Sequence, residues 1–175
     1  MLISKKMASA INTQVGNEFG ASLQYVAIGA YFGSENLPGL SAHFHKQGAE
    51  ERDHALRLVN YVVEAGSRAK IPSIPAPKSE FKNAEEAVAL SVNWELTVTK
   101  QINGLVDLAI TEKDHITRNF LQWFVNEQLE EVSSMETLLS IVRRAGEGGL
   151  LLVEDYLARR GGVAAAGSAG GGTSG

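Results

Sequence analysis

Residues 50–54 read Glu50-Glu51-Arg52-Asp53-His54 and lie in the middle of a predicted helix. Glu51 and His54 are three positions apart, so on a helix their side chains lie next to each other on one face. Four-helix bundles use such a Glu-x-x-His unit to hold a pair of iron or manganese ions, with single glutamates from other helices completing the site. The unit therefore predicts a metal pair inside a helical bundle, provided that other helices supply matching glutamates.

The composition is that of a globular protein without cysteine chemistry. The chain has 175 residues, of which 44% are hydrophobic and 21% are charged, and it is most simply one domain. Because cysteine is absent, any metal must be held by carboxylate and imidazole groups. The net charge of −4 argues against a nucleic-acid partner. Since no apolar run has signal-peptide or membrane-spanning length, we expect no membrane partner and a cytoplasmic location.

Four long segments have the apolar spacing of amphipathic helices, and proline or glycine follows the first two. These helices are expected over residues 1–35, from Ser41 to about Ala65, from about Ala84 to Thr111, and from about His115 to Ala145. Ser4 is the predicted N-cap of the first helix. The pattern predicts the all-α class, because no strand pattern of any length occurs.

The segment between the second and third helices contains Pro72, Pro75 and Pro77 and shows little periodicity. Proline-rich chain extends about 3.1 Å per residue, so this segment can reach roughly 50 Å, whereas a helix of about 25 residues is roughly 38 Å long. We therefore expect a long crossover loop that spans the bundle, so that helices two and three run in the same direction.

The C-terminal part is expected to contain a short fifth helix and a tail. Leu150 to about Arg160 is apolar at its start and too short to be stable alone. The residues after it are glycine, alanine and serine, a composition typical of flexible linkers. The predicted organisation is a four-helix bundle over 1–146, the fifth helix over 147–160 and the tail over 161–175.

Each predicted bundle helix carries metal-ligand types in the middle of its apolar stripe. They are Glu18 in the first helix, Glu51 and His54 in the second, Glu95 in the third, and Gln128 and Glu131 in the fourth. Carboxylates in an apolar core need a compensating cation. The alternative is that the helical registers are off by one position, which would place these groups in solvent. That alternative is the commoner one for a single glutamate, but four helices rarely misregister together.

The set of polar residues in the four apolar stripes resembles that of the non-haem ferritins of bacteria, and the resemblance covers residues 1 to about 160. The matching positions are Glu18, Glu51-x-x-His54, Glu95 and Glu127-Gln128-x-Glu130-Glu131, with Tyr25 one heptad after Glu18 and Trp123 before the last group. The resemblance implies a first iron held by Glu18, Glu51 and His54. It implies that Glu51 bridges to a second iron, which Glu95 and Glu131 also bind.

The resemblance also assigns roles to the remaining residues of the set. Gln128 is at most a weak ligand, and Tyr25 stands beside the centre. Glu50, Glu127 and Glu130 match the third iron site of many bacterial ferritins. The fourth helix lacks the second Glu-x-x-His of bacterioferritins, and Arg52 stands where bacterioferritins place their haem-binding methionine, so no haem is expected.

The function that the resemblance implies is iron storage with ferroxidase activity. Fe(II) would be oxidised to Fe(III) by dioxygen or peroxide and stored as ferric mineral inside a hollow homo-oligomer, a 24-mer. Tyr25 and Trp123 are candidate electron donors, although core packing is the simpler explanation of Trp123. Two alternatives stay open, namely a di-iron or di-manganese oxidase that stores nothing and a structural bundle with an inactive site.

Three further features have weaker functional interpretations. Glu112, Asp114 and His115 fall where ferritins build a three-fold pore, although turns are commonly polar. His43 and His45 are expected to be surface groups rather than ligands. The apolar run over residues 150–153 indicates contact with other subunits, because a monomer would expose it.

Overall fold

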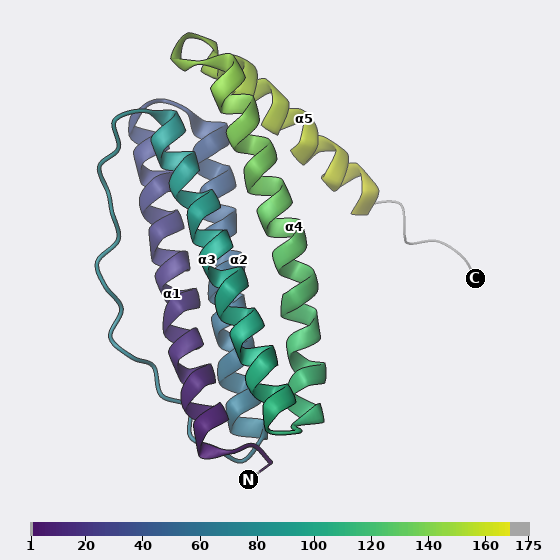
Figure 1. Cartoon of the computed structure of the whole chain (residues 1–175). Coiled ribbons are helices and arrows are strands. Elements are labelled where there is room, and N and C mark those ends of the chain that lie inside the picture. Colours follow the sequence, from purple (N-terminus) through teal and green to yellow (C-terminus); the bar gives the residue numbers. More distant parts are fainter. Residues whose placement is uncertain (1, 169–175) are drawn as a thin grey trace, which may run out of the picture.

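The computed structural model describes residues 2–168 and is a bundle of four long helices with a further helix at one end (Figure 1). The helices are α1 (Lys5–Ser34), α2 (Pro38–Glu64), α3 (Ala84–Thr111), α4 (His115–Ala145), the short 3-10 helix η1 (Glu147–Gly149) and α5 (Leu150–Ser168). The predicted all-α class and four-helix bundle are confirmed. Among the described residues, no helix is long and apolar enough to cross a membrane.

Polar side chains cap three of the four bundle helices at their N-termini. Ser4 accepts a hydrogen bond from the backbone N–H of Met7 at 2.9 Å, as the sequence predicts. Asn83 caps α3 and Asp114 caps α4 in the same way, each at 2.9 Å. Because a capped N-terminus satisfies N–H groups that have no partner inside the helix, these residues fix where each helix begins.

The second helix begins at Pro38, earlier than the predicted start at Ser41. Proline is favoured in the first turn because its missing N–H would have no partner there. The turn is capped from a distance: the carboxylate of Glu154 in α5 accepts from the backbone N–H groups of Gly39 at 2.6 Å and Leu40 at 2.8 Å. This contact docks α5 onto the start of α2.

The crossover segment, residues 66–83, runs along the outside of the bundle beside α1, from the end of α2 to the start of α3 (Figure 1). The Asn12 side chain bonds to the backbone carbonyl of Arg68 at 3.2 Å and the N–H of Lys70 at 2.9 Å. The Gln24 side chain bonds to both the carbonyl and the N–H of Lys78, at 2.8 and 2.9 Å. As predicted, α2 and α3 run in the same direction.

The polar residues predicted in the middle of the apolar stripes face the interior and are all buried, namely Glu18, Glu51, His54, Glu95, Gln128 and Glu131. The apolar core has two parts. One part contains Phe32, Phe44, Val92 and Met135, and the other contains Ile11, Leu58, Val98 and Phe124. In every bundle helix a buried glutamate lies between these two parts. The core is therefore divided by a charged layer at mid-height.

The fifth helix is longer than the sequence predicts, since α5 continues past Arg160 to Ser168. The alanines at 164–166 have the highest helix propensity of any residue, which offsets the neighbouring glycines. Leu150 and Val153 are buried against the bundle, whereas Leu151 and Leu152 are exposed. Residues 169–175 of the predicted tail lie outside the described part of the chain.

Candidate metal centre

Four carboxylates and one imidazole meet in the charged layer. Glu18, Glu51 and Glu95 are each 1% exposed, and His54 and Glu131 are 7% exposed. They form two groups, one of Glu18, Glu51 and His54 and the other of Glu51, Glu95 and Glu131. Within each group, one ligand-type atom per residue lies within 4.8 Å of the others. Because Glu51 belongs to both groups, the arrangement offers two adjacent cation positions that share one carboxylate.

The imidazole of His54 turns Nδ1 toward the carboxylates. This atom lies 3.3 Å from Oε2 of Glu51 and 3.8 Å from Oε1 of Glu131. The ring is held edge-on against Trp123 and Phe124, with ring centroids 5.2 and 6.0 Å apart. The aromatic neighbours fix the ring plane, so that Nδ1 is available as the single nitrogen ligand of the centre.

Among the carboxylates of the centre, Glu95 accepts hydrogen bonds on both of its oxygens. The hydroxyl of Tyr25 donates to Oε1. The amide Nε2 of Gln128 donates to Oε2 at 3.1 Å and to the backbone carbonyl of Glu95 at 3.3 Å. Gln128 thus contacts a candidate ligand as a donor, in keeping with the weak ligand role that the resemblance implies.

Three carboxylate oxygens in the centre are buried without a hydrogen-bond partner. They are Oε2 of Glu18, Oε1 of Glu51 and Oε2 of Glu131. A buried carboxylate oxygen without a partner costs free energy unless a proton or a cation compensates it. The orphaned oxygens are therefore positions where a hard cation would supply the missing partner.

Burial is the largest cause of the pKa shifts in the centre. It raises the pKa of Glu95 to about 7, and together with the neighbouring carboxylates it raises the pKa of Glu131 to about 11. Burial also raises the pKa of Glu51 well above its usual value and that of Glu18 above its own. Without a cation the cluster retains protons, and a divalent cation that binds there displaces them.

A family model described as the ferritin-like domain matches residues 8–145. The chain belongs to the ferritin family. It is 42% identical over 163 residues to ferritin BfrB of Mycobacterium tuberculosis, covering 93% of this chain and 90% of that protein. It is 35% identical to the bacterial non-heme ferritin of Staphylococcus haemolyticus, covering 91% of this chain and 97% of that one. The open pore ferritin of Archaeoglobus fulgidus is similar in structure, with a TM-score of 0.86 and 37% identity, over 89% of this chain and 96% of that one.

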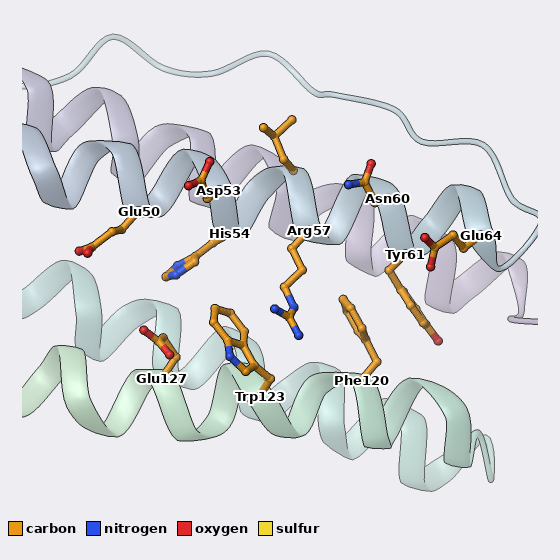
Figure 2. A pocket seen from close by; sticks show the side chains of 11 residues that line it. Glu50, Asp53, His54, Arg57, Asn60, Tyr61, Glu64, Phe120, Trp123 and Glu127 are labelled. Carbon is orange, nitrogen blue, oxygen red and sulfur yellow. The ribbon is translucent and has the colours of Figure 1, made fainter. Parts of the chain in front are cut away.

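Two of the three predicted third-site residues of this ferritin, Glu50 and Glu127, lie on facing sides of a groove between α2 and α4 (Figure 2). Glu127 is half-buried and forms a third group with His54 and Glu131, again within 4.8 Å. Glu50 faces it from α2 and pairs with Lys46 at 3.2 Å. Glu130 is exposed. Among the described residues, the structure joins Glu127 to the centre but does not gather all three predicted residues in one group.

Two interactions near the centre are not predicted from the sequence. The guanidinium of Arg57 lies over the ring of Trp123, 4.1 Å from the ring centroid, in the same groove. Gln14 donates from Nε2 to Oε1 of Glu18 at 2.9 Å. The spacing of four residues between Gln14 and Glu18 is the signal that would have revealed this second contact.

Two of the three predicted pore residues, Glu112 and Asp114, have structural partners. Oε2 of Glu112 accepts from the hydroxyl of Ser4 at 2.7 Å, and Asp114 is the N-cap of α4. His115 is exposed. These contacts tie the turn between α3 and α4 to the start of α1, and the pore role stays a prediction.

The two histidines near the start of α2 differ from each other. His45 is exposed, as the sequence predicts. His43 is half-buried, with Nε2 buried and unpartnered, and burial lowers its pKa to about 4. The prediction of a surface position for His43 is therefore wrong, because α5 covers this part of α2.

Proposed function

We propose that this protein stores iron and oxidises Fe(II) to Fe(III) at the centre built around Glu51. One observation carries the proposal: two groups of buried ligands share Glu51 inside a chain of the ferritin family. In this proposal Glu18, Glu51 and His54 hold the first Fe(II). Glu51 bridges to a second Fe(II), which Glu95 and Glu131 also hold.

The charge and chemistry of the site suit two ferrous ions. Four ionised carboxylates balance the charge of two divalent cations, and a set of oxygen ligands with a single nitrogen suits iron. Each Fe(II) loses one electron. The two electrons and two protons convert dioxygen to hydrogen peroxide, or one hydrogen peroxide to two waters. The protein holds the two ions close together so that both electrons reach one oxidant.

Residues around the centre have supporting roles in the proposal. Tyr25 donates to Glu95 and is a candidate electron donor, while Gln128 donates to Glu95 and is at most a weak iron ligand. Glu50, Glu127 and Glu130 hold a third ion next to the centre, and the grouping of Glu127 with His54 and Glu131 supports this site. No residue is proposed for haem.

The product of oxidation is proposed to enter a mineral inside a hollow 24-mer in the cytoplasm. Relatives and structural neighbours named as ferritins support a cage-forming role. The exposed Leu151 and Leu152 on α5 support burial of this helix between copies of the chain. Size-exclusion chromatography with iron analysis of the eluted particle tests this part. A small particle that turns over Fe(II) and retains no iron would instead support a non-storing di-iron oxidase.

The ferroxidase proposal is tested by anaerobic Fe(II) titration followed by stopped-flow oxidation. The wild-type chain should bind two Fe(II) tightly and oxidise them in a fast phase. Glu51→Ala should abolish this phase, because both ions lose a ligand, whereas Glu136→Ala, at an exposed position of α4, should retain it. A fast phase that persists in Glu51→Ala would refute the proposed centre and favour a structural bundle.

A further inference from the structure

A chain of amide side chains in α1 leads to Glu18. Gln14 is 2% exposed, and its Nε2 donates to Oε1 of Glu18 at 2.9 Å. Nδ2 of Asn17 donates to Oε1 of Gln14 at 3.0 Å. The three residues occupy positions i, i+3 and i+4 of one helix, so the helix itself brings the side chains together.

The chemistry of these groups allows only one order of donors and acceptors from Asn17 through Gln14 to Glu18. An ionised carboxylate only accepts hydrogen bonds, so Gln14 must turn its NH2 group toward Glu18. The carbonyl oxygen of Gln14 then faces Asn17, which must donate in its turn. If the Gln14 amide were flipped, its oxygen would face the carboxylate and its NH2 group would face that of Asn17. Asn17 therefore stabilises the orientation in which Gln14 donates to Glu18, because it supplies the donor that the Gln14 oxygen needs.

The hydrogen bond from Gln14 leaves the two carboxylate oxygens of Glu18 in different situations. Oε1 is held by Gln14, whereas Oε2 is buried and has no hydrogen-bond partner. Glu95 differs, because both of its oxygens accept from protein donors. We propose that Gln14, itself held by Asn17, is a positioning residue that presents Oε2 of Glu18 to the first metal ion. This inference rests on the function proposed above.

Asn17, the residue of this hydrogen-bonded series farthest from the centre, does not line the groove between α2 and α4. Asn17 is half-buried and lines a cleft between α1, α3 and the crossover segment, together with Gly20, Pro75 and Trp94. A substitution at Asn17 thus changes the orientation of Gln14 without replacing a group of the centre. This separation makes Asn17 the informative position for a test.

The test compares Asn17→Asp with Asn17→Leu by anaerobic titration with Co(II), whose visible absorption reports its coordination. Asp has the shape of Asn but only accepts, so Gln14 can no longer satisfy both neighbours. We expect Asn17→Asp to weaken the first Co(II) by about tenfold, the lower end of the effect of losing a ligand-orienting group. Asn17→Leu, which adds no acceptor, should weaken it less. The second Co(II) should bind as in the wild type.

Competing explanations predict the opposite order. If only charge mattered, the added carboxylate of Asn17→Asp would tighten cation binding. If Asn17 only filled space, Leu would be more harmful than the isosteric Asp. Either result would overturn the inference, and so would equal binding in both variants. Gln14→Met, of similar length but without a donor, should also weaken the first Co(II), and unchanged binding there would equally overturn it.

The outcome for the wild-type chain separates this inference from the proposed function. If the wild type does not bind two Co(II) ions, the proposed centre itself is wrong. If the wild type binds two Co(II) ions and the variants bind the first Co(II) with the same affinity, only the positioning role of Gln14 is wrong.

Discussion

The phenolic hydroxyl of Tyr25 donates a hydrogen bond to Oε1 of Glu95 and so joins α1 to α3 inside the charged layer. Burial raises the pKa of Tyr25 well above its usual value, so the hydroxyl stays protonated and remains a donor. The same hydrogen bond lowers the pKa of Glu95, against the larger effect of burial. Tyr25 therefore favours the ionised, metal-binding form of Glu95.

Removal of this hydroxyl in Tyr25→Phe is expected to affect both stability and oxidation. Oε1 of Glu95 loses its donor while it remains buried, which should lower the free energy of unfolding of the metal-free protein by about 1–3 kcal/mol. The less well oriented carboxylate should slow Fe(II) oxidation by about tenfold or more. Urea denaturation and stopped-flow absorbance measure the two effects. If neither changes, the contact has no role.

The raised pKa values predict that the metal-free protein loses stability as the pH rises. The pKa of Glu95 is about 7 in the folded protein, against its ordinary value of 4.5 in the unfolded chain. Below both values the carboxyl is protonated in both states. As the pH rises, the unfolded chain releases its proton first, which favours unfolding. For Glu95 this loss is complete above about pH 7 and is on the order of 3 kcal/mol.

Glu131 extends the same loss to higher pH, because its pKa is about 11. Urea denaturation of the metal-free protein should thus give a lower free energy of unfolding at about pH 8 than at about pH 5. Glu131→Gln should reduce this difference, since it removes a carboxyl group whose pKa lies far above its ordinary value. Saturating Co(II) should reverse the trend, because protons then compete with the cation. A metal-free protein that becomes more stable from about pH 5 to about pH 8 would contradict the prediction.

The sequence predicts the bundle well because local periodicity decides which face of each helix is buried. The stripe through Glu18 or Glu95 is readable from its apolar neighbours, and the length of the crossover segment determines the relative directions of α2 and α3. Contacts between distant segments are not readable in this way. Glu154 capping α2 and Gln24 holding the backbone of Lys78 join residues that share no local pattern. The start of α2 at Pro38 is misjudged for the same reason, since its cap comes from α5.

The contact between α5 and α2 predicts a specific effect of Glu154→Ala. The N–H groups of Gly39 and Leu40 lose their acceptor, which should cost about 1–2 kcal/mol, as for other lost N-caps. Hydrogen exchange at these two amides should become faster, and urea denaturation should show the loss of stability. Asp155→Ala is the matched control, because Asp155 is exposed and pairs only with Arg159 among the described residues. Equal behaviour of the two variants would show that Glu154 does not hold α5.

Two glycines inside helices are expected to respond differently to substitution by alanine. A Cβ at Gly16 would lie 2.3 Å from Cγ of Pro72, in the rigid ring of the crossover segment, whereas a Cβ at Gly104 meets no atom within 4 Å. Gly104→Ala should stabilise the protein by about 1 kcal/mol through helix propensity alone. Gly16→Ala gains the same propensity but must displace the crossover segment, and overpacking of this kind costs about 1–3 kcal/mol. Urea denaturation should therefore give a lower midpoint for Gly16→Ala than for Gly104→Ala. Equal stabilisation by both would mean that the crossover segment lies only loosely on α1.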